Sequence, residues 1–140
     1  MARHYTTTEG VVYTNTLLNE VTEHDSGKDS AFSRGHLIAG AKAVVLEFTG
    51  AETGEAGEGQ VTIQVSIDGE DSWRDYKMLI ENKADSETQQ LTRVESFTVS
   101  DDGSYLFFMT PETLGGLTHI RAKLQITSAG KYTVKANIAY

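Results

Sequence analysis

Cysteine is absent from the sequence, and proline occurs once. Without cysteine the fold has no disulfide bonds, and it offers no thiol nucleophile. A chain of 140 residues can still bury roughly 68% of its unfolded surface, which is enough for a self-sufficient core. We therefore expect a single domain that needs neither disulfides nor metal to fold.

Long apolar runs are also missing. The N-terminal residues contain no apolar stretch that could act as a signal peptide. No segment approaches the ~20 consecutive apolar residues of a membrane span. The sequence thus predicts a soluble protein with no signal peptide and no membrane partner.

Positive charge is scarce, since 12 basic against 20 acidic side chains give a net charge of −8. Proteins that bind nucleic acid without sequence preference rely on Lys and Arg to neutralise phosphates. The charge balance therefore argues against a nucleic-acid partner. It fits a particle surface and a solvated secreted domain equally well.

Catalytic patterns are lacking too. There is no Gly-x-Ser-x-Gly motif, and no His-x-His or His-Glu-x-x-His pair that could bind zinc. The histidines lie at unrelated positions: His4, His24, His36 and His119. We predict that the protein is not an enzyme and uses no metal or cofactor.

One acidic, glycine-rich segment, Thr49–Gly59, carries Glu52, Glu55 and Glu58. Calcium sites use stiff loops rich in Asp and Asn, and closing so flexible a segment around an ion would cost backbone entropy. We therefore expect a solvated hairpin loop between two strong strands.

The clearest positive signal is the segment Val61–Trp73, which contains the only tryptophan. Its first residues alternate strictly between apolar and polar side chains, as in a strand with one buried face. Asp68-Gly69 then supplies the positive φ of a tight turn.

Similar strands separated by turn residues recur along the chain, without a sustained helical period. This pattern predicts an all-β fold, a single antiparallel β-sandwich of jelly-roll type with about eight strands. The Glu- and Lys-containing segment Leu79–Leu91 is predicted as a loop with at most one turn, and Thr110–Glu112 as a single helical turn. The expected strands are Val11–Leu18, Lys42–Thr49, Gln60–Ile67, Trp73–Ile80, Gln90–Val99, Ser104–Thr110, Leu117–Thr127 and Lys131–Ala139.

Residues 1–35 differ from the rest because their apolar side chains are scattered. They are expected to form either a polar N-terminal arm or a first strand followed by a long loop, and residues 36–140 the sandwich domain.

The last two predicted strands carry alternating basic residues. If they form a hairpin, its outer face collects a third of the basic side chains of the chain. We hypothesise that this face docks on an acidic surface of a neighbouring subunit, such as the Glu52, Glu55 and Glu58 loop. The outer residues are His119, Arg121, Lys123, Lys131 and Lys135.

The strand Ser104–Met109 is apolar on both faces. One set of side chains belongs in the core, and the other is a candidate contact surface. Leu106 and Phe108 form one set, and Tyr105, Phe107 and Met109 form the other. We assign the second set to the assembly interface.

Two families share parts of this pattern. Ser66–Trp73 is similar to the Asp-box hairpin of sialidase-like propellers, but it occurs once and the chain is too short for several blades. The chain resembles more broadly a class of small β-sandwich virion proteins of tailed bacteriophages. The resemblance rests on Ala43–Phe48, the Ser66–Trp73 hairpin, Gly103–Tyr105 and Ile120-Arg121.

This resemblance implies a non-enzymatic structural protein of the virion, made in the host cytoplasm. The favoured form is a capsid decoration (cement) protein that binds the major capsid protein or other virion subunits across capsomer seams, and self-associates as a trimer. One alternative is a tail or head–tail adaptor ring subunit. Another is a carbohydrate- or receptor-binding module, which would use Trp73, Tyr76, Asp71 and Asp75.

Overall fold

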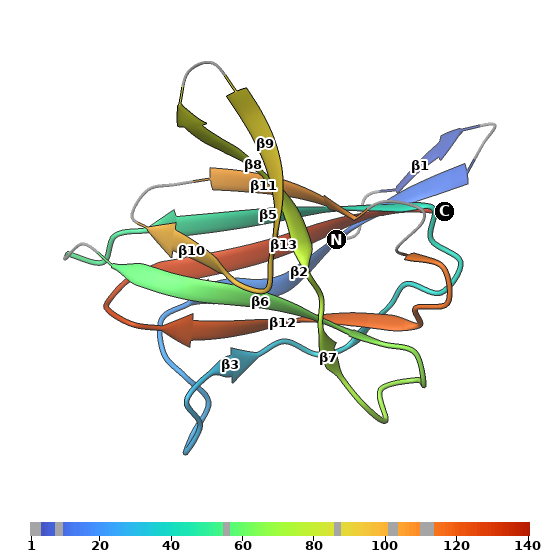
Figure 1. Cartoon of the computed structure of the whole chain (residues 1–140). Helices are drawn as coiled ribbons and strands as arrows, with labels where there is room; N and C mark the ends of the chain where they lie inside the picture. Colours follow the sequence, from blue (N-terminus) through green and yellow to red (C-terminus); the bar gives the residue numbers. More distant parts are fainter. Residues whose placement is uncertain (1–3, 8–9, 55–56, 86–87, 101–103, 110–113) are drawn as a thin grey trace.

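The protein is described by a computed structural model that covers residues 4–7, 10–54, 57–85, 88–100, 104–109 and 114–140. These residues form thirteen strands in two antiparallel sheets packed face to face (Figure 1). The predicted all-β sandwich is therefore confirmed, with thirteen strands in place of about eight. Within the described ranges, no helix has the length and apolar character needed to cross a membrane.

Sheet A has seven strands in the order β1-β2-β13-β5-β11-β8-β9. Strands β2, β13 and β5 are long and lie side by side, and they form the main part of this larger sheet. The strands are β1 (His4–Thr7), β2 (Gly10–Val21), β13 (Lys131–Ala139), β5 (Ala43–Ala51), β11 (Ser104–Met109), β8 (Met78–Asp85) and β9 (Thr88–Val94).

Sheet B has six strands, with β10-β6-β12-β3 in order, β4 paired with β12 and β7 paired with β6. Its centre is the long antiparallel pair β6 and β12. Along the chain from β10 to β13, each strand belongs to the opposite sheet from the one before it. The strands are β10 (Phe97–Ser100), β6 (Glu58–Ser66), β12 (His119–Ile126), β3 (Ala31–Phe32), β4 (His36–Leu37) and β7 (Arg74–Asp75).

The core lies between the sheets and follows the alternation seen in the sequence. On β6, β12 and β13 every second residue is buried, as the period of two predicts. Phe48 packs against Phe107, with ring centroids 4.8 Å apart.

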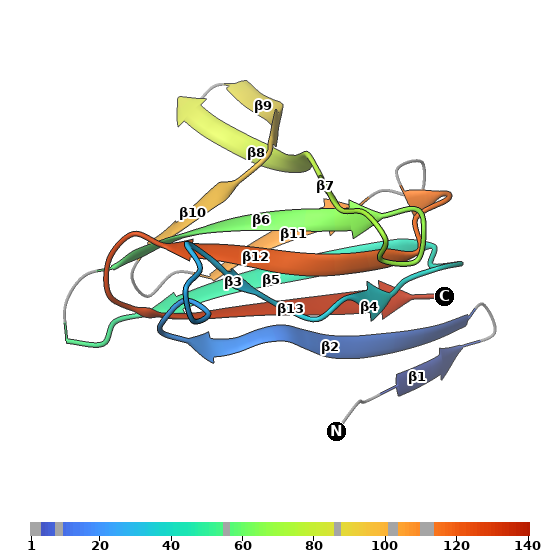
Figure 2. The same ribbon diagram turned by 90° about the horizontal axis from the view of Figure 1, so that it is seen from below.

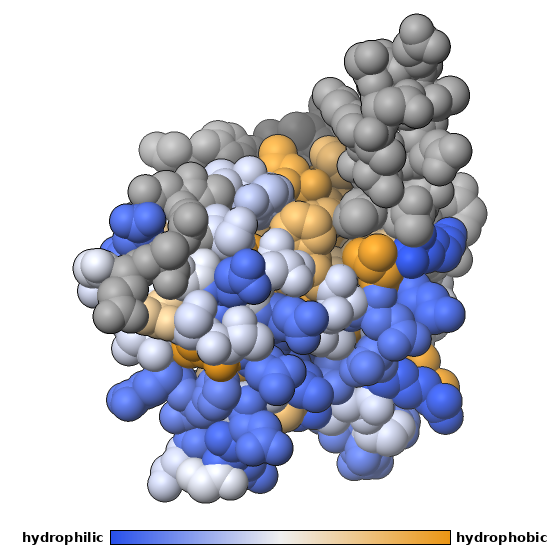
Figure 3. All heavy atoms as spheres, turned by 60° about the vertical axis from the view of Figure 1, so that its left-hand side comes forward, coloured by the Kyte–Doolittle hydropathy of each residue, from blue (hydrophilic) through white to orange (hydrophobic). Residues whose placement is uncertain are grey.

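On the side drawn in Figure 3, hydrophobic surface is concentrated in the upper part of the view, and hydrophilic residues dominate the lower part.

The described part of residues 1–35 supplies both a strand and a loop to the sandwich. Strand β2 pairs with β13, and Leu17 and Leu18 are buried in the core. The pairing is irregular at Val134, where the register shifts. Strand β1 pairs with the outer edge of β2.

The segment predicted as a loop at Leu79–Leu91 is instead the β8–β9 hairpin, so that prediction was wrong. Backbone pairing between the two arms, and with β11 at Phe108, makes this polar segment extended although its side chains do not favour strands. Figures 1 and 2 both show the hairpin standing out from the body of the sandwich. The predicted helical turn at Thr110–Glu112 lies outside the described residues.

Two predicted strands are each divided in the structure. Trp73–Ile80 becomes β7 in sheet B and β8 in sheet A, and Gln90–Val99 becomes β9 in sheet A and β10 in sheet B. The chain changes sheets at both places, and a change of sheet interrupts the strand although the residues on either side are extended.

Candidate contact surfaces on the two sheets

The predicted basic face is divided between the two sides of the molecule. Strands β12 and β13 belong to different sheets and do not pair, so the predicted hairpin between them was wrong. Arg121 and Lys123 lie on the outer face of sheet B, whereas Lys131 and Lys135 lie on the outer face of sheet A. The alternation in the sequence identified the outward side chains correctly but did not specify which sheet each strand joins.

The acidic segment between β5 and β6 joins the two sheets, so it is not the hairpin loop that the sequence predicted. Glu52 and Glu58 are exposed, and Glu55 lies outside the described residues. Glu58 is the first residue of β6, and its backbone is fixed by its neighbours. Its amide donates to Ser128 Oγ at 2.8 Å, and its carbonyl oxygen accepts from the Thr127 amide at 3.0 Å.

Strand β11 has one face in the core and one in solvent. Phe107 and Met109 are 5% and 2% exposed, and Tyr105 is half-buried against Phe97. The assignment of these three residues to an assembly interface was therefore wrong, because sheet B covers that face of the strand. The other set, Leu106 and Phe108, is 57% and 59% exposed.

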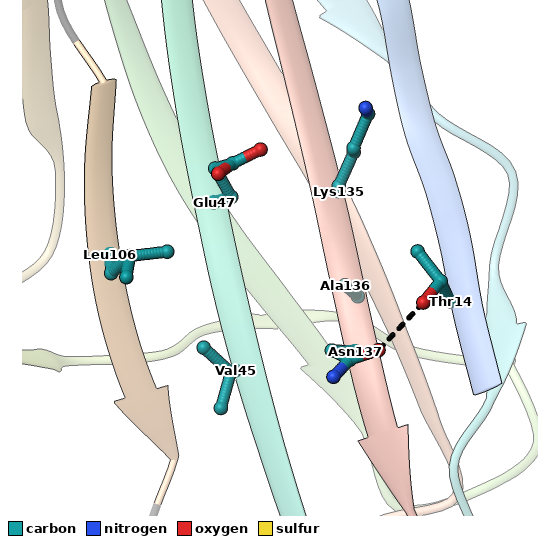
Figure 4. A pocket seen from close by; sticks show the side chains of 7 residues that line it. All are labelled: Thr14, Val45, Glu47, Leu106, Lys135, Ala136 and Asn137. Atoms are coloured by element: carbon teal, nitrogen blue, oxygen red, sulfur yellow. Dashed lines mark hydrogen bonds between the residues drawn. The ribbon is translucent and has the colours of Figure 1, made fainter. Parts of the chain in front are cut away.

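On the outer face of sheet A, Leu106 lines a shallow hollow of roughly 280 Å³ (Figure 4). In the strand register Phe108 is opposite Val45, and Leu106 is opposite Glu47. Glu47 is in turn opposite Lys135 on β13. We call Val45, Leu106 and Phe108 the β11 patch. The hollow is lined by Thr14, Val45, Glu47, Leu106, Lys135, Ala136 and Asn137.

Polar residues border the patch on the side of β13 and β2. Thr14 Oγ1 donates a hydrogen bond of 2.7 Å to Asn137 Oδ1 across the two strands. The surface thus combines an apolar strip with an ordered polar rim. This is the arrangement found in protein–protein contacts.

The hairpin Ser66–Trp73 lies at one end of sheet B and is organised by Asp68. The Asp68 carboxylate accepts hydrogen bonds from Ser72 Oγ at 2.6 Å and from Ser66 Oγ at 2.7 Å. The hydroxyls of Ser72 and then Ser66 lower the pKa of Asp68 to about 2. Gly69 has a φ of 71°, as the turn prediction requires, and Glu70 also has a positive φ of 83°. A positive φ is costly for a glutamate, so contacts around the hairpin must maintain it.

Glu70 folds back onto sheet B. Its carboxylate lies against Gly35, where a β-carbon would overlap it. The other oxygen is 3.9 Å from Nε2 of His119, whose Nδ1 is buried without a hydrogen-bond partner among the described residues. Burial and then the charge of Arg34 lower the pKa of His36, and Glu70 opposes this shift.

The most ordered group on this face surrounds Arg121. Its guanidinium carbon is 4.4 Å from the centroid of the Trp73 ring and 4.8 Å from that of Phe32. Arg121 Nε donates a 2.8 Å hydrogen bond to Gln64 Oε1, and Gln64 Nε2 donates at 2.9 Å to Asp75 Oδ1. We call Arg121, Trp73, Phe32 and Gln64 the Arg121 stack. Burial lowers the pKa of Arg121, and the charge of Glu70 opposes this shift.

The residues of the predicted sugar site do not form one platform. Arg121 packs on the Trp73 ring, Tyr76 is half-buried against the core, and Asp75 is bound by Gln64. Asp71 is exposed in the hairpin. Sugar binding therefore stays a prediction. The sequence offered no signal for Phe32 or Gln64, because both reach the stack only through strand pairing.

Comparisons with known proteins show a relationship in fold. No family model matches the chain, and no curated protein matches it in sequence. The structure is similar to the crystal structure of the SPBc2 prophage-derived protein YomS, with a TM-score of 0.54 and 12% sequence identity. The match covers 92% of this chain and 95% of that one. The two chains therefore share their sandwich fold over nearly their whole lengths.

Proposed function

We propose that this protein is a non-enzymatic structural subunit of a phage particle, with capsid decoration as the favoured role. The observation that carries the proposal is the β11 patch. Leu106 and Phe108 expose more than half of their surface on the outer face of sheet A, although their strand neighbours are buried. Adjacent exposed apolar side chains with a polar border mark a surface that binds another protein.

The phage context comes from two independent resemblances. The sequence carries the weak motifs of small virion sandwiches, and the fold is similar to that of a prophage-derived protein. The likeness in structure concerns the fold, and the association with phage is taken from the name of that protein. A small, acidic, cysteine-free sandwich suits a particle surface.

A decoration protein stabilises a shell because it binds the assembled state and not the free subunits, so that mass action favours the assembled state. The β11 patch would supply the apolar area of this contact. Glu47, Lys135 and Asn137 would orient it. We also propose that the protein self-associates, with a trimer favoured.

The test is to locate the protein in particles released by cells that carry its gene. Heads and tails are separated by density, and each fraction is analysed by mass spectrometry. We expect the protein in the head fraction. Its absence from both fractions would refute the proposal, and its presence only in tails would favour the tail or adaptor ring.

A matched pair of variants tests whether the β11 patch makes the contact. Phe108→Ser should greatly reduce the amount bound to heads. Leu37→Ser changes an equally exposed apolar side chain, 60% exposed on β4, and should leave binding unchanged. Equal occupancy of both variants would contradict the role of the patch.

A further inference from the structure

Arg121 is a partly buried cation that makes no salt bridge in the described part of the chain, although the charge of Glu70 acts on it. On this face the carboxylate of Glu70 lies 3.9 Å from Nε2 of His119. Among the residues that the structure describes, the Arg121 guanidinium makes one hydrogen bond, from Nε to Gln64. A charge that has lost part of its hydration is normally paired, because burying it unpaired is costly.

The geometry of the stack leaves the two terminal nitrogens of Arg121 available. The rings of Phe32 and Trp73 and the bond to Gln64 fix the orientation of the guanidinium. Its planar fork matches a carboxylate, which can accept two parallel hydrogen bonds from it. Since the side chain is already ordered, little further conformational entropy is lost on binding.

The charges facing the stack do not complete it. Lys123 Nζ is 6.0 Å from the centroid of the Phe32 ring and adds positive charge. Glu70 is directed to His119, and Asp75 accepts a hydrogen bond from Gln64. The missing group is therefore a carboxylate supplied from outside the chain.

The chain itself carries a suitable carboxylate at the opposite end of the same sheet. Glu58 is exposed, and its backbone is held by Thr127 and Ser128. It precedes Gln64 by six residues on β6, a separation of ~20 Å at the rise of a strand. Glu58 therefore cannot reach Arg121 of its own chain, but Glu58 of a second copy can.

We propose that the Arg121 stack binds the Glu58 carboxylate of a second copy of this protein. The acidic end of one subunit then lies on the outer face of sheet B of the next. The proposed contact is head-to-tail: each subunit uses Arg121 toward one neighbour and Glu58 toward the other, and the subunits close into a ring. This inference does not depend on the proposed contact of the β11 patch with a capsid, which concerns the opposite sheet.

Static light scattering of the purified protein over a range of concentration and salt tests the proposal. We expect a mass at low salt well above the 15.3 kDa of one chain, decreasing as salt is added. Arg121→Gln and Glu58→Gln should each weaken the association roughly 30-fold or more. Arg121→Lys should have an intermediate effect, since it keeps the charge but not the fork. Arg93→Gln, at an exposed arginine on β9, is the matched control and should associate like the wild type.

Mixing the two neutral variants tests the direction of the contact. Only Arg121 of the Glu58→Gln chain can pair with Glu58 of the Arg121→Gln chain, so the mixture should stop at two chains. A wild-type protein that stays monomeric at all concentrations would overturn the proposal. So would association that survives Arg121→Gln or Glu58→Gln in variants whose thermal unfolding shows them to be folded. All these outcomes concern the isolated protein, so they are independent of whether it is found in particles.

Discussion

The two sheets differ in how their outward aromatic residues are covered, although each also exposes a leucine, Leu106 on sheet A and Leu37 on sheet B. On sheet A, Leu106 and Phe108 stand in solvent. On sheet B, Phe32 and Trp73 enclose the guanidinium of Arg121, and both rings are half-buried. An outward aromatic residue is therefore not by itself a contact surface, because a neighbouring cation can cover it.

The cover on sheet B comes from chain segments that fold over its edges. Strand β3 is fixed to β12 through Ser33, whose hydroxyl accepts a 2.8 Å hydrogen bond from the Ala122 amide. The hairpin end is fixed by the Thr118 amide, which donates to the Ser66 carbonyl oxygen at 2.8 Å. Figure 2 shows β3 alongside β12 and β7 alongside β6.

The largest expected change in the free energy of unfolding distinguishes the buried face of strand β11 from its exposed face. Phe107→Ala should lower the free energy of unfolding by about 3–5 kcal/mol, because it leaves a cavity beside Phe48. Phe108→Ala, one residue away, should change it by less than about 0.5 kcal/mol. Urea unfolding of both variants measures the contrast. Similar losses in the two variants would mean that sheet A is covered as sheet B is.

Removing the indole from the Arg121 stack should have a smaller cost. Trp73→Ala should lower the free energy of unfolding by about 2 kcal/mol, from lost apolar burial and a lost cation–π contact. A double-mutant cycle with Arg121→Gln should give a coupling of about 1 kcal/mol. A coupling of zero would show that the ring and the guanidinium do not support each other.

The β11 patch should be removable at almost no cost in stability. The double variant Leu106→Ser/Phe108→Ser should keep its free energy of unfolding within about 0.5 kcal/mol of the wild type, since both side chains are exposed. It should also bind less of a hydrophobic dye, as measured by fluorescence. Unchanged dye binding would mean that the exposed apolar surface lies elsewhere.

The smallest expected effect is a loss of stability at low pH, which arises in the Ser66–Trp73 hairpin of sheet B. The pKa of Asp68 falls from 3.8 to about 2, so its hydrogen bonds stabilise the fold fully above about pH 4. This contribution is lost as the pH falls from about 4 to 2, through the lowered pKa. An NMR titration of the Asp68 carboxyl carbon should show the low midpoint, and Ser72→Ala should raise it. A midpoint near 3.8 in the wild type would contradict this account.

Part of the fold could be predicted because it depends on the sequence within single strands and turns. The alternation along β6 identified the buried face, and Gly69 marked the turn. The β8–β9 hairpin could not be predicted in this way, since its strands depend on backbone pairing and not on side-chain preference. For strand β11 both faces are apolar, so nothing local could tell Phe107 from Phe108.

The alternation of apolar and polar residues was enough to predict an antiparallel sandwich and the outward side chains of β6, β12 and β13. A period of two is a property of each strand, so it needs no knowledge of its neighbours. Only the tertiary structure decided that β12 and β13 lie in opposite sheets, which separates Arg121 from Lys135. The same pairing brings Phe32 and Trp73 to Arg121. Sites of this kind combine residues distant in sequence, and only the order of strands brings such residues together.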